Sequence, residues 1–252
     1  MLVSTPNVAR AFHVFSTLQA GSSGSSRCIS SRANAIFKDA KSAEFLAAVG
    51  DKESLSLLGG LPEVVVTGRA NVGKSSLLNS VIGRRDLLFT SKKAGRTQTL
   101  NFFRVGSPPG RLVVVDSPGY GARGRPEWGA LFNHYLETRK AVIHLTPCYR
   151  LCRVFILISA AHGMGATDEA MLSSLDAQIQ SLDGTCWTLQ AIITRADVLK
   201  ANGRTQINQI EQDIFRIAPT CLPPIITSCP SKGIAFGIDE VRKSIYHACG
   251  IL

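Results

Sequence analysis

Apolar runs and helical spacing alternate along the chain from residue 62 onward, and this order predicts an α/β domain. Apolar, β-branched runs that predict strands cover residues 62–67, 100–105, 111–115, 153–159, 187–194 and 223–227. Helical spacing covers residues 76–83, 127–140, 168–182 and 206–217, and a closing helix opens at residue 237. We therefore expect a doubly wound, mostly parallel six-stranded sheet, with one antiparallel strand contributed by the hairpin around Pro108.

The pattern before residue 62 is mixed, and we interpret residues 41–60 as a linker. Phe45, Leu46 and Val49 recur on one helical face, so residues 43–49 are expected to form a helical turn or two. Further along, Thr167 is a candidate cap for the helix that follows it. The apolar stripe of the helix over residues 127–140 is expected to be core, and comprises Trp128, Leu131, Phe132, Tyr135 and Leu136.

The most informative motif lies between the first predicted strand and the first predicted helix. It fills every fixed position of the phosphate loop G-x-x-x-x-G-K-[ST] and comprises Gly68, Arg69, Ala70, Asn71, Val72, Gly73, Lys74 and Ser75, followed by Ser76. Backbone N–H groups of such a loop, together with the helix N-terminus, face an anion. Lys74 would reach the β and γ phosphates, and the Ser75 hydroxyl would bind Mg²⁺.

Two further segments fit the magnesium and γ-phosphate side of such a site. A polar loop contains Gly95, Arg96, Thr97, Gln98 and Thr99, and it occupies the place of switch I in GTPases. Thr97 is our candidate for the hydroxyl that closes on magnesium, although a basic, solvent-exposed loop is an open alternative. The second segment follows the strand over residues 111–115 and matches D-x-x-G, with Asp116, Ser117, Pro118 and Gly119. Asp116 would hold magnesium, and the Gly119 N–H would sense the γ phosphate.

Catalysis of hydrolysis is expected to differ from that in Ras-like enzymes, in which a glutamine after D-x-x-G orients the attacking water. Tyr120 stands at this position, so we expect slow intrinsic hydrolysis. Asn71 suggests an alternative, because GTPases that use a potassium ion for transition-state charge carry asparagine at this place. The candidate catalytic residues are Lys74, Thr97 and Asn71, and K⁺ is a second candidate cofactor beside Mg²⁺.

Base selection is expected at the end of the strand over residues 187–194, where N/T-K-x-D motifs read guanine. The candidates there are Thr194, Arg195, Ala196 and Asp197. The Asp197 carboxylate would accept hydrogen bonds from the two donors of guanine, which adenine lacks. After the last strand, Thr227, Ser228 and Cys229 would offer a backbone N–H to the guanine O6.

Composition changes the picture in three ways. The net charge of +10 favours a polyanionic partner such as RNA or an anionic membrane face. The seven cysteines are scattered and match no zinc or disulfide pattern, so we expect reduced thiols in an intracellular compartment. No apolar run reaches the ~18 residues of a membrane span, and we expect no stable membrane insertion.

The N-terminal segment has the composition of an organellar presequence. Residues 1–38 contain no Asp or Glu, four basic residues and a Ser/Gly-rich stretch. We expect residues 1–40 to be a mitochondrial presequence, with a disordered extension as the open alternative. The nucleotide-binding domain is expected to cover residues 61–252.

Taken together, these motifs resemble the EngB (YihA/YsxC-like) family of TRAFAC-class P-loop GTPases. The resemblance covers roughly residues 60–250 and rests on residues 62–64, 68–77, 90–92, 95–98, 101–103, 116–121, 135–139 and 194–197. It departs from the family at Arg195, which replaces the usual lysine, in a longer segment 139–153 that carries Cys148 and Cys152, and in a short insertion within residues 229–237.

The resemblance implies a P-loop GTPase fold and a GTPase that assists assembly of the large ribosomal subunit. With the presequence it implies a mitochondrial version that binds GTP and GDP, contacts rRNA or the large subunit, and acts as a monomer. Bacterial members are also linked to cell division, so a nucleotide-dependent switch at a membrane or division site is the competing hypothesis. The lack of a basic amphipathic helix in residues 60–252 favours the ribosomal role.

Overall fold

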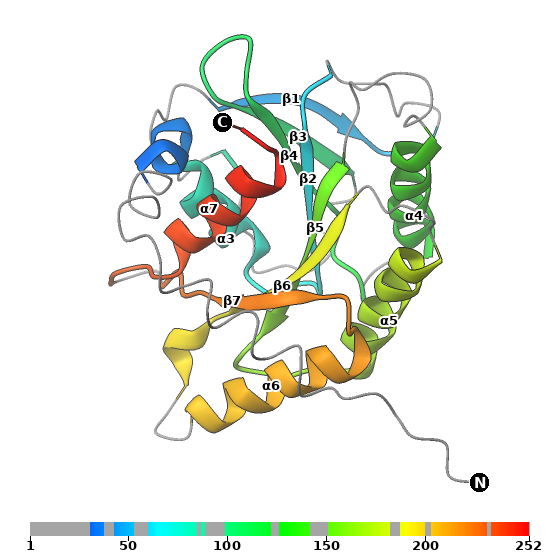
Figure 1. Ribbon diagram of the computed structural model, residues 1–252, viewed down its shortest axis with the longest axis vertical. Helices are drawn as coiled ribbons and strands as arrows, with labels where there is room; N and C mark the ends of the chain where they lie inside the picture. Colours follow the sequence, from blue (N-terminus) through cyan, green and yellow to red (C-terminus); the bar gives the residue numbers. More distant parts are fainter. Residues whose placement is uncertain are drawn as a thin grey trace, which may run out of the picture.

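The computed structural model has the α/β architecture that the sequence pattern predicts (Figure 1). It describes residues 31–37, 43–52, 60–84, 87–88, 99–121, 126–141, 151–181, 187–199, 203–230 and 233–251. The strands are β1 (Glu44–Val49), β2 (Glu63–Gly68), β3 (Leu100–Val105), β4 (Leu112–Asp116), β5 (Leu151–Ser159), β6 (Thr188–Thr194) and β7 (Leu222–Ile226). The helices are α3 (Lys74–Ile82), α4 (Pro126–Ala141), α5 (Ala166–Gln180), α6 (Gly203–Ile217) and α7 (Ile238–Ala248), and residues 31–37 form a further helix.

The strands form one seven-stranded sheet in the order β1-β3-β4-β2-β5-β6-β7. All six predicted strands are present. β2 pairs in parallel with β4 and β5, and β6 pairs in parallel with β5 and β7. β3 is antiparallel to β4, which confirms the predicted antiparallel strand at the Pro108 hairpin. The carboxyl ends of the five parallel strands therefore meet at one edge of the sheet.

β1 is the seventh strand, and it corrects the prediction of a helical turn over residues 43–49 within a linker. It pairs antiparallel with β3, and the Phe45 ring packs edge-on against Phe103 with centroids 5.6 Å apart. A helix of this length is unstable by itself in water. The free edge of β3 offers a ladder of hydrogen bonds and an apolar neighbour instead, and tertiary context of this kind overrides local spacing.

Helices cover both faces of the sheet, each over its own apolar cluster (Figure 1). On one face α3, α7 and the helix over residues 31–37 pack against the sheet, with Val241 and Ile245 of α7 turned inward as predicted. On the other face α4, α5 and α6 cover the sheet, and the predicted core residues Leu131, Phe132, Tyr135 and Leu136 of α4 are buried there. None of the helices in the described part of the chain has the length and apolar character needed to cross a membrane.

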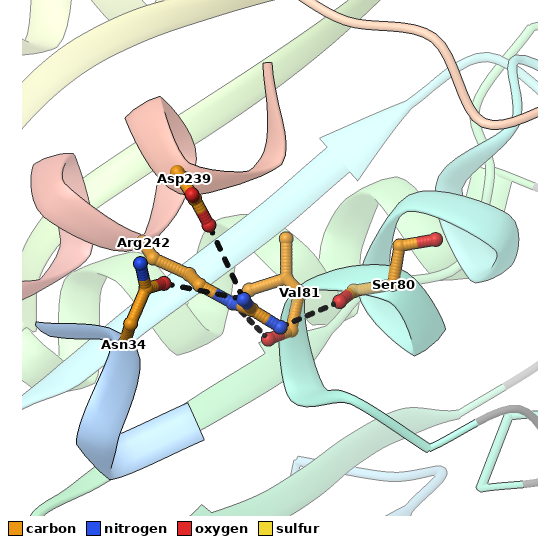
Figure 2. A network of polar contacts seen from close by, with 5 residues as sticks. All are labelled: Asn34, Ser80, Val81, Asp239 and Arg242. Atoms are coloured by element: carbon orange, nitrogen blue, oxygen red, sulfur yellow. Dashed lines mark hydrogen bonds and ion pairs between the residues drawn. The ribbon is translucent and has the colours of Figure 1, made fainter. Parts of the chain in front are cut away.

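The guanidinium of Arg242 ties three helices together on the α3 face (Figure 2). Its Nε donates to the carbonyl of Val81 at 2.9 Å and its Nη2 to the carbonyl of Ser80 at 3.0 Å, so a cation caps the C-terminal end of α3. Its Nη1 donates to Oδ1 of Asn34 at 3.2 Å. Ala33 and Phe37 have no exposed surface, so residues 31–37 are built into the domain although the predicted extension includes them.

A buried ion pair fixes α4 to the start of β2. Oε2 of Glu63 accepts hydrogen bonds from the Tyr135 hydroxyl at 2.7 Å and from Arg139 Nε at 2.9 Å. The side chains of Glu63 and Arg139 have no exposed surface. Burial, with the neighbouring Glu63 carboxylate as a second cause, raises the pKa of Tyr135 well above its ordinary value, so the hydroxyl remains a donor.

Replacing Glu63 with alanine is expected to lower the free energy of unfolding by about 3–5 kcal/mol, because Arg139 would keep a buried charge without its counter-ion. The matched control is Glu44→Ala, which breaks the exposed ion pair between Glu44 and Arg104 on β1 and β3. That change should cost less than about 1 kcal/mol. Urea unfolding of both variants checks the prediction, and equal losses would contradict it.

Candidate functional site

The predicted site motifs lie at the carboxyl edge of the sheet. The phosphate loop follows β2, D-x-x-G begins with the last residue of β4, T-R-A-D begins with the last residue of β6, and Ser228 follows β7. Because parallel strands end at the same edge, motifs that lie far apart in the sequence become neighbours. Thr194 shows this directly, since its hydroxyl donates to the carbonyl of Val72 in the phosphate loop at 2.7 Å.

The phosphate loop has the backbone shape that its glycines predict. Gly73 directly precedes α3 and has a backbone φ of +101°. Residues other than glycine rarely adopt this conformation. Gly68 is required by crowding, because a Cβ there would lie 2.9 Å from Leu157 Cβ. Lys74 and Ser75 form the first turn of α3, so the helix begins two residues earlier than the spacing predicts and its N-terminus faces the loop.

Lys74 and Asp116 meet as an ion pair at the centre of this edge. Lys74 Nζ lies 2.6 Å from Asp116 Oδ1, and the two side chains are 9% and 2% exposed. This contact joins the phosphate loop to D-x-x-G, as the motif pairing predicts. The Asp116 carboxylate is buried, and carboxylate and hydroxyl oxygens are hard ligands of the kind that Mg²⁺ prefers. Asp116 and Ser75 would therefore be suited to hold a magnesium ion, which would neutralise charge on the phosphates of a bound nucleotide.

Only part of the predicted magnesium and switch-loop region lies within the described residues. Among the described residues, no cluster of three or more His, Cys, Asp or Glu side chains is present to hold a metal by protein ligands alone. The third predicted ligand, Thr97, lies outside the described residues together with Gly95, Arg96 and Gln98. Thr99 directly precedes β3, and its hydroxyl donates to Asn101 Oδ1 at 2.9 Å. Asn101 stands opposite Asp116 in the ladder, so this end of the predicted switch loop reaches the same edge.

The predicted base-reading residues also come together. Asp197 lies on a short 3₁₀ turn (Ala196–Val198) after β6, and its Oδ1 accepts a hydrogen bond from the Ser228 hydroxyl at 2.6 Å. The Ala196 N–H donates to the carbonyl of Thr227 at 3.2 Å, so the two loops are joined by backbone as well. Asp197 is exposed and Ser228 is buried. The carboxylate is thus accessible from solvent, as a base-reading residue must be, and a buried hydroxyl fixes its direction.

Arg195 and Cys229, which depart from the usual residues of GTPases, both fit the local structure. Arg195 has φ +58° and is exposed, and its Nε lies near the phosphate loop, 4.0 Å from where a Cβ of Gly73 would stand. A planar guanidinium there can stack on a flat base. Burial raises the pKa of the Cys229 thiol, which therefore remains protonated and behaves as a small, apolar side chain.

Sequence reasoning missed Asp168 and assigned the cap of α5 to Thr167. The helix begins at Ala166 with Gly165 as its N-cap, and the Gly165 N–H donates to Asp168 Oδ2 at 3.0 Å. Thr167 lies inside the first turn, so its assignment as a cap is wrong. Asp168 also contacts Tyr120 and Arg69 of the site. An acidic residue in a first helical turn is common, and nothing in its local pattern shows these distant contacts.

Known proteins with similar sequences are guanine-nucleotide-binding proteins. A family model described as "50S ribosome-binding GTPase" matches residues 63–182. The "Probable GTP-binding protein EngB" of Chelativorans sp. (strain BNC1) is 36% identical over 202 residues, which is 75% of this chain and 81% of that protein. The protein of the same name from Bartonella tribocorum is 34% identical over 199 residues, 74% of this chain and 84% of that protein.

Similar solved structures share the fold at lower identity. Era in complex with MgGDPNP and nucleotides 1506–1542 of 16S ribosomal RNA is 19% identical and has a TM-score of 0.53. That match covers 75% of this chain and 56% of the Era chain, so this chain spans little more than half of Era. Toc33 from Arabidopsis thaliana, in complex with GDP and Mg²⁺, has a TM-score of 0.52 and 13% identity over 77% of this chain and 86% of its own.

Proposed function

This chain belongs to the EngB family of GTP-binding proteins and is a GTPase, and we propose that it acts as an assembly factor for the large subunit of the mitochondrial ribosome. The observation that carries the proposal is the match of residues 63–182 to a family described by its binding to the 50S subunit. The net charge of +10 supports an RNA partner, because phosphate contacts dominate the affinity of proteins for nucleic acids.

We further propose that hydrolysis is slow without a partner and that the nucleotide acts as a switch. Tyr120 takes the place where Ras-like enzymes carry the water-orienting glutamine. Its hydroxyl is bound to Asp168 at 3.0 Å, so the side chain is engaged with α5. A GTP-bound form that persists long enough to bind a ribosomal precursor is a useful property in an assembly factor.

The direct test is sedimentation of the purified protein with large ribosomal subunits in the presence of GTP, GDP or a non-hydrolysable GTP analogue. We expect co-migration with the analogue and much less with GDP. Raising the salt concentration should weaken the association steeply, as release of counter-ions from RNA requires. Absence of co-migration in every nucleotide state would contradict a ribosomal role and favour the division-site switch.

A mitochondrial location is proposed from the acid-free, Arg- and Ser-bearing composition of the N-terminal segment. Since residues 31–37 pack into the domain, we place any removed segment before residue 31. Fusing residues 1–30 to a fluorescent reporter tests this placement. Mitochondrial fluorescence is expected, and a cytosolic signal would contradict the proposal.

Potassium is proposed as an activating ion at Asn71. This residue is exposed in the phosphate loop, where its amide oxygen could hold a monovalent cation beside the phosphates. Its φ of +64° is one that asparagine tolerates better than most residues. Turnover in potassium buffer should exceed turnover in sodium buffer, and equal rates would remove the idea.

A further inference from the structure

One buried carboxylate connects the phosphate loop, the D-x-x-G segment and helix α5. Asp168 Oδ1 accepts a hydrogen bond from the Tyr120 hydroxyl at 3.0 Å. Its Oδ2 lies 3.3 Å from Arg69 Nη1 and accepts the Gly165 N–H at 3.0 Å. The Asp168 side chain is 1% exposed. Two hydrogen-bond donors and one positive charge thus face the same carboxylate, and together they compensate for its burial.

The backbone couples Tyr120 to the phosphate loop independently of these side chains. The Tyr120 N–H donates to the carbonyl of Gly68 and the Ala70 N–H donates to the carbonyl of Tyr120, each at 3.3 Å. Gly119 lies so close to the loop that a Cβ there would stand 3.1 Å from the backbone of Ala70. A shift of Tyr120 would therefore move Gly119, whose N–H is the expected sensor of the γ phosphate.

We propose that Asp168 is a positioning residue for GTP hydrolysis, which acts by anchoring Tyr120 and Arg69 so that Gly119 is held against the phosphate loop. Asp168 itself does not need to touch the nucleotide. The proposal rests on the GTPase activity and is independent of the ribosomal role. It also assigns Tyr120 an anchoring role in the place where Ras-like enzymes use a glutamine.

The chemistry of the three groups suits a fixed anchor. Burial, and the adjacent Asp168 carboxylate as the second cause, raise the pKa of Tyr120 well above its ordinary value of 10.0. The hydroxyl therefore keeps its proton and donates throughout the neutral range. Arg69 adds a positive charge beside the carboxylate and is 27% exposed, so its contact with Asp168 is the weaker of the two side-chain links.

An anchor of this kind should affect the γ phosphate more than the rest of the nucleotide. Tyr120→Phe removes one hydroxyl and keeps the ring, so the fold should be retained. We expect kcat for GTP to fall about tenfold and the affinity for a non-hydrolysable GTP analogue to fall by a similar factor. The affinity for GDP should stay within about twofold of the original, because GDP lacks the γ phosphate that the Gly119 N–H is expected to contact. Asp168→Asn should shift the same quantities in the same direction.

The matched control is Asp176→Asn, two turns further along α5. Asp176 is also buried and accepts hydrogen bonds from Thr220, outside the site. The Asp176→Asn substitution should lower the thermal stability of the protein without changing the ratio of its affinity for the GTP analogue to its affinity for GDP. The double variant of Tyr120→Phe and Asp168→Asn should have a kcat close to that of Asp168→Asn alone. Both substitutions act on the same hydrogen bond, between the Tyr120 hydroxyl and Asp168, so their effects should not add.

Three results would overturn the proposal. The first is an unchanged kcat and analogue affinity in Tyr120→Phe. The second is an equal loss of GDP and analogue affinity, which would indicate general damage to the nucleotide site. The third is the same change in the affinity ratio in Asp176→Asn, which would attribute the effect to the stability of α5.

Discussion

Replacing Lys74 is expected to reduce GTP hydrolysis by about 10²–10³-fold, the loss that follows removal of one preorganised donor at a site of developing charge. Lys74 is the lysine of the phosphate-loop motif, and it lies in the first turn of α3 with its Nζ 2.6 Å from Asp116 Oδ1. Removing it takes positive charge away from the β and γ phosphates. It also leaves the 2%-exposed Asp116 without its partner, which would destabilise the fold.

Two variants separate these effects. Lys74→Ala should lose both hydrolysis and thermal stability. Lys74→Arg keeps a positive charge beside Asp116, so the melting temperature should remain near that of the original protein. Hydrolysis should still fall, because a guanidinium is wider and cannot take the place of a compact ammonium among the phosphates. A folded Lys74→Arg protein with the original kcat would contradict the assignment of Lys74.

The second large effect is expected at Asp197, where an exchange for asparagine should lower the affinity for GTP by about a hundredfold or more. The carboxylate would accept from two guanine donors, and hydrogen bonds to a charged group contribute about 1.5–3 kcal/mol each. The asparagine amide has one acceptor oxygen, and its NH₂ group would face the second guanine donor, so that two donors would oppose each other. The same donor suits xanthine, which carries a carbonyl in place of the exocyclic amine, so Asp197→Asn should gain affinity for xanthosine triphosphate.

Ser228→Ala is the matched change for this prediction. It removes the hydroxyl that donates to Asp197 at 2.6 Å but leaves the carboxylate in place. GTP affinity should fall by roughly tenfold, the effect of one hydrogen bond to a charged group, without a gain for xanthine. Competition binding with GTP and xanthosine triphosphate measures both variants. Unchanged GTP affinity in Asp197→Asn would place base recognition elsewhere.

The sequence pattern predicts the sheet well because burial on both faces leaves a strong local signal. β2, β4 and β5 are mostly apolar runs without an exposed residue, and the sequence pattern predicts all three. β1 was missed since it is a half-exposed edge strand whose apolar residues also fit a helix. Its conformation depends on pairing with β3, which is more than fifty residues away in the sequence.

The residues of the candidate site also fall into two groups. Some belong to local sequence motifs and are predictable, whereas others become neighbours only when the chain folds. Lys74, Asp116 and Asp197 each stand in a motif whose order along the chain is informative, and the structure brings each to the carboxyl edge. Asp168 is 48 residues from Tyr120, and Asn34 is 208 residues from Arg242. Contacts over such separations leave no periodicity or spacing in one sequence. Thr97 and its neighbours remain a prediction, because they lie outside the described residues.

Calorimetric titration of the purified protein with GDP and with ADP in magnesium buffer tests the central claim most directly. A site built from the phosphate loop, Asp116 and the Asp197–Ser228 pair should bind GDP with one site per chain and should show no saturable binding of ADP. Absence of binding to GDP, or equal binding of the two nucleotides, would contradict the account.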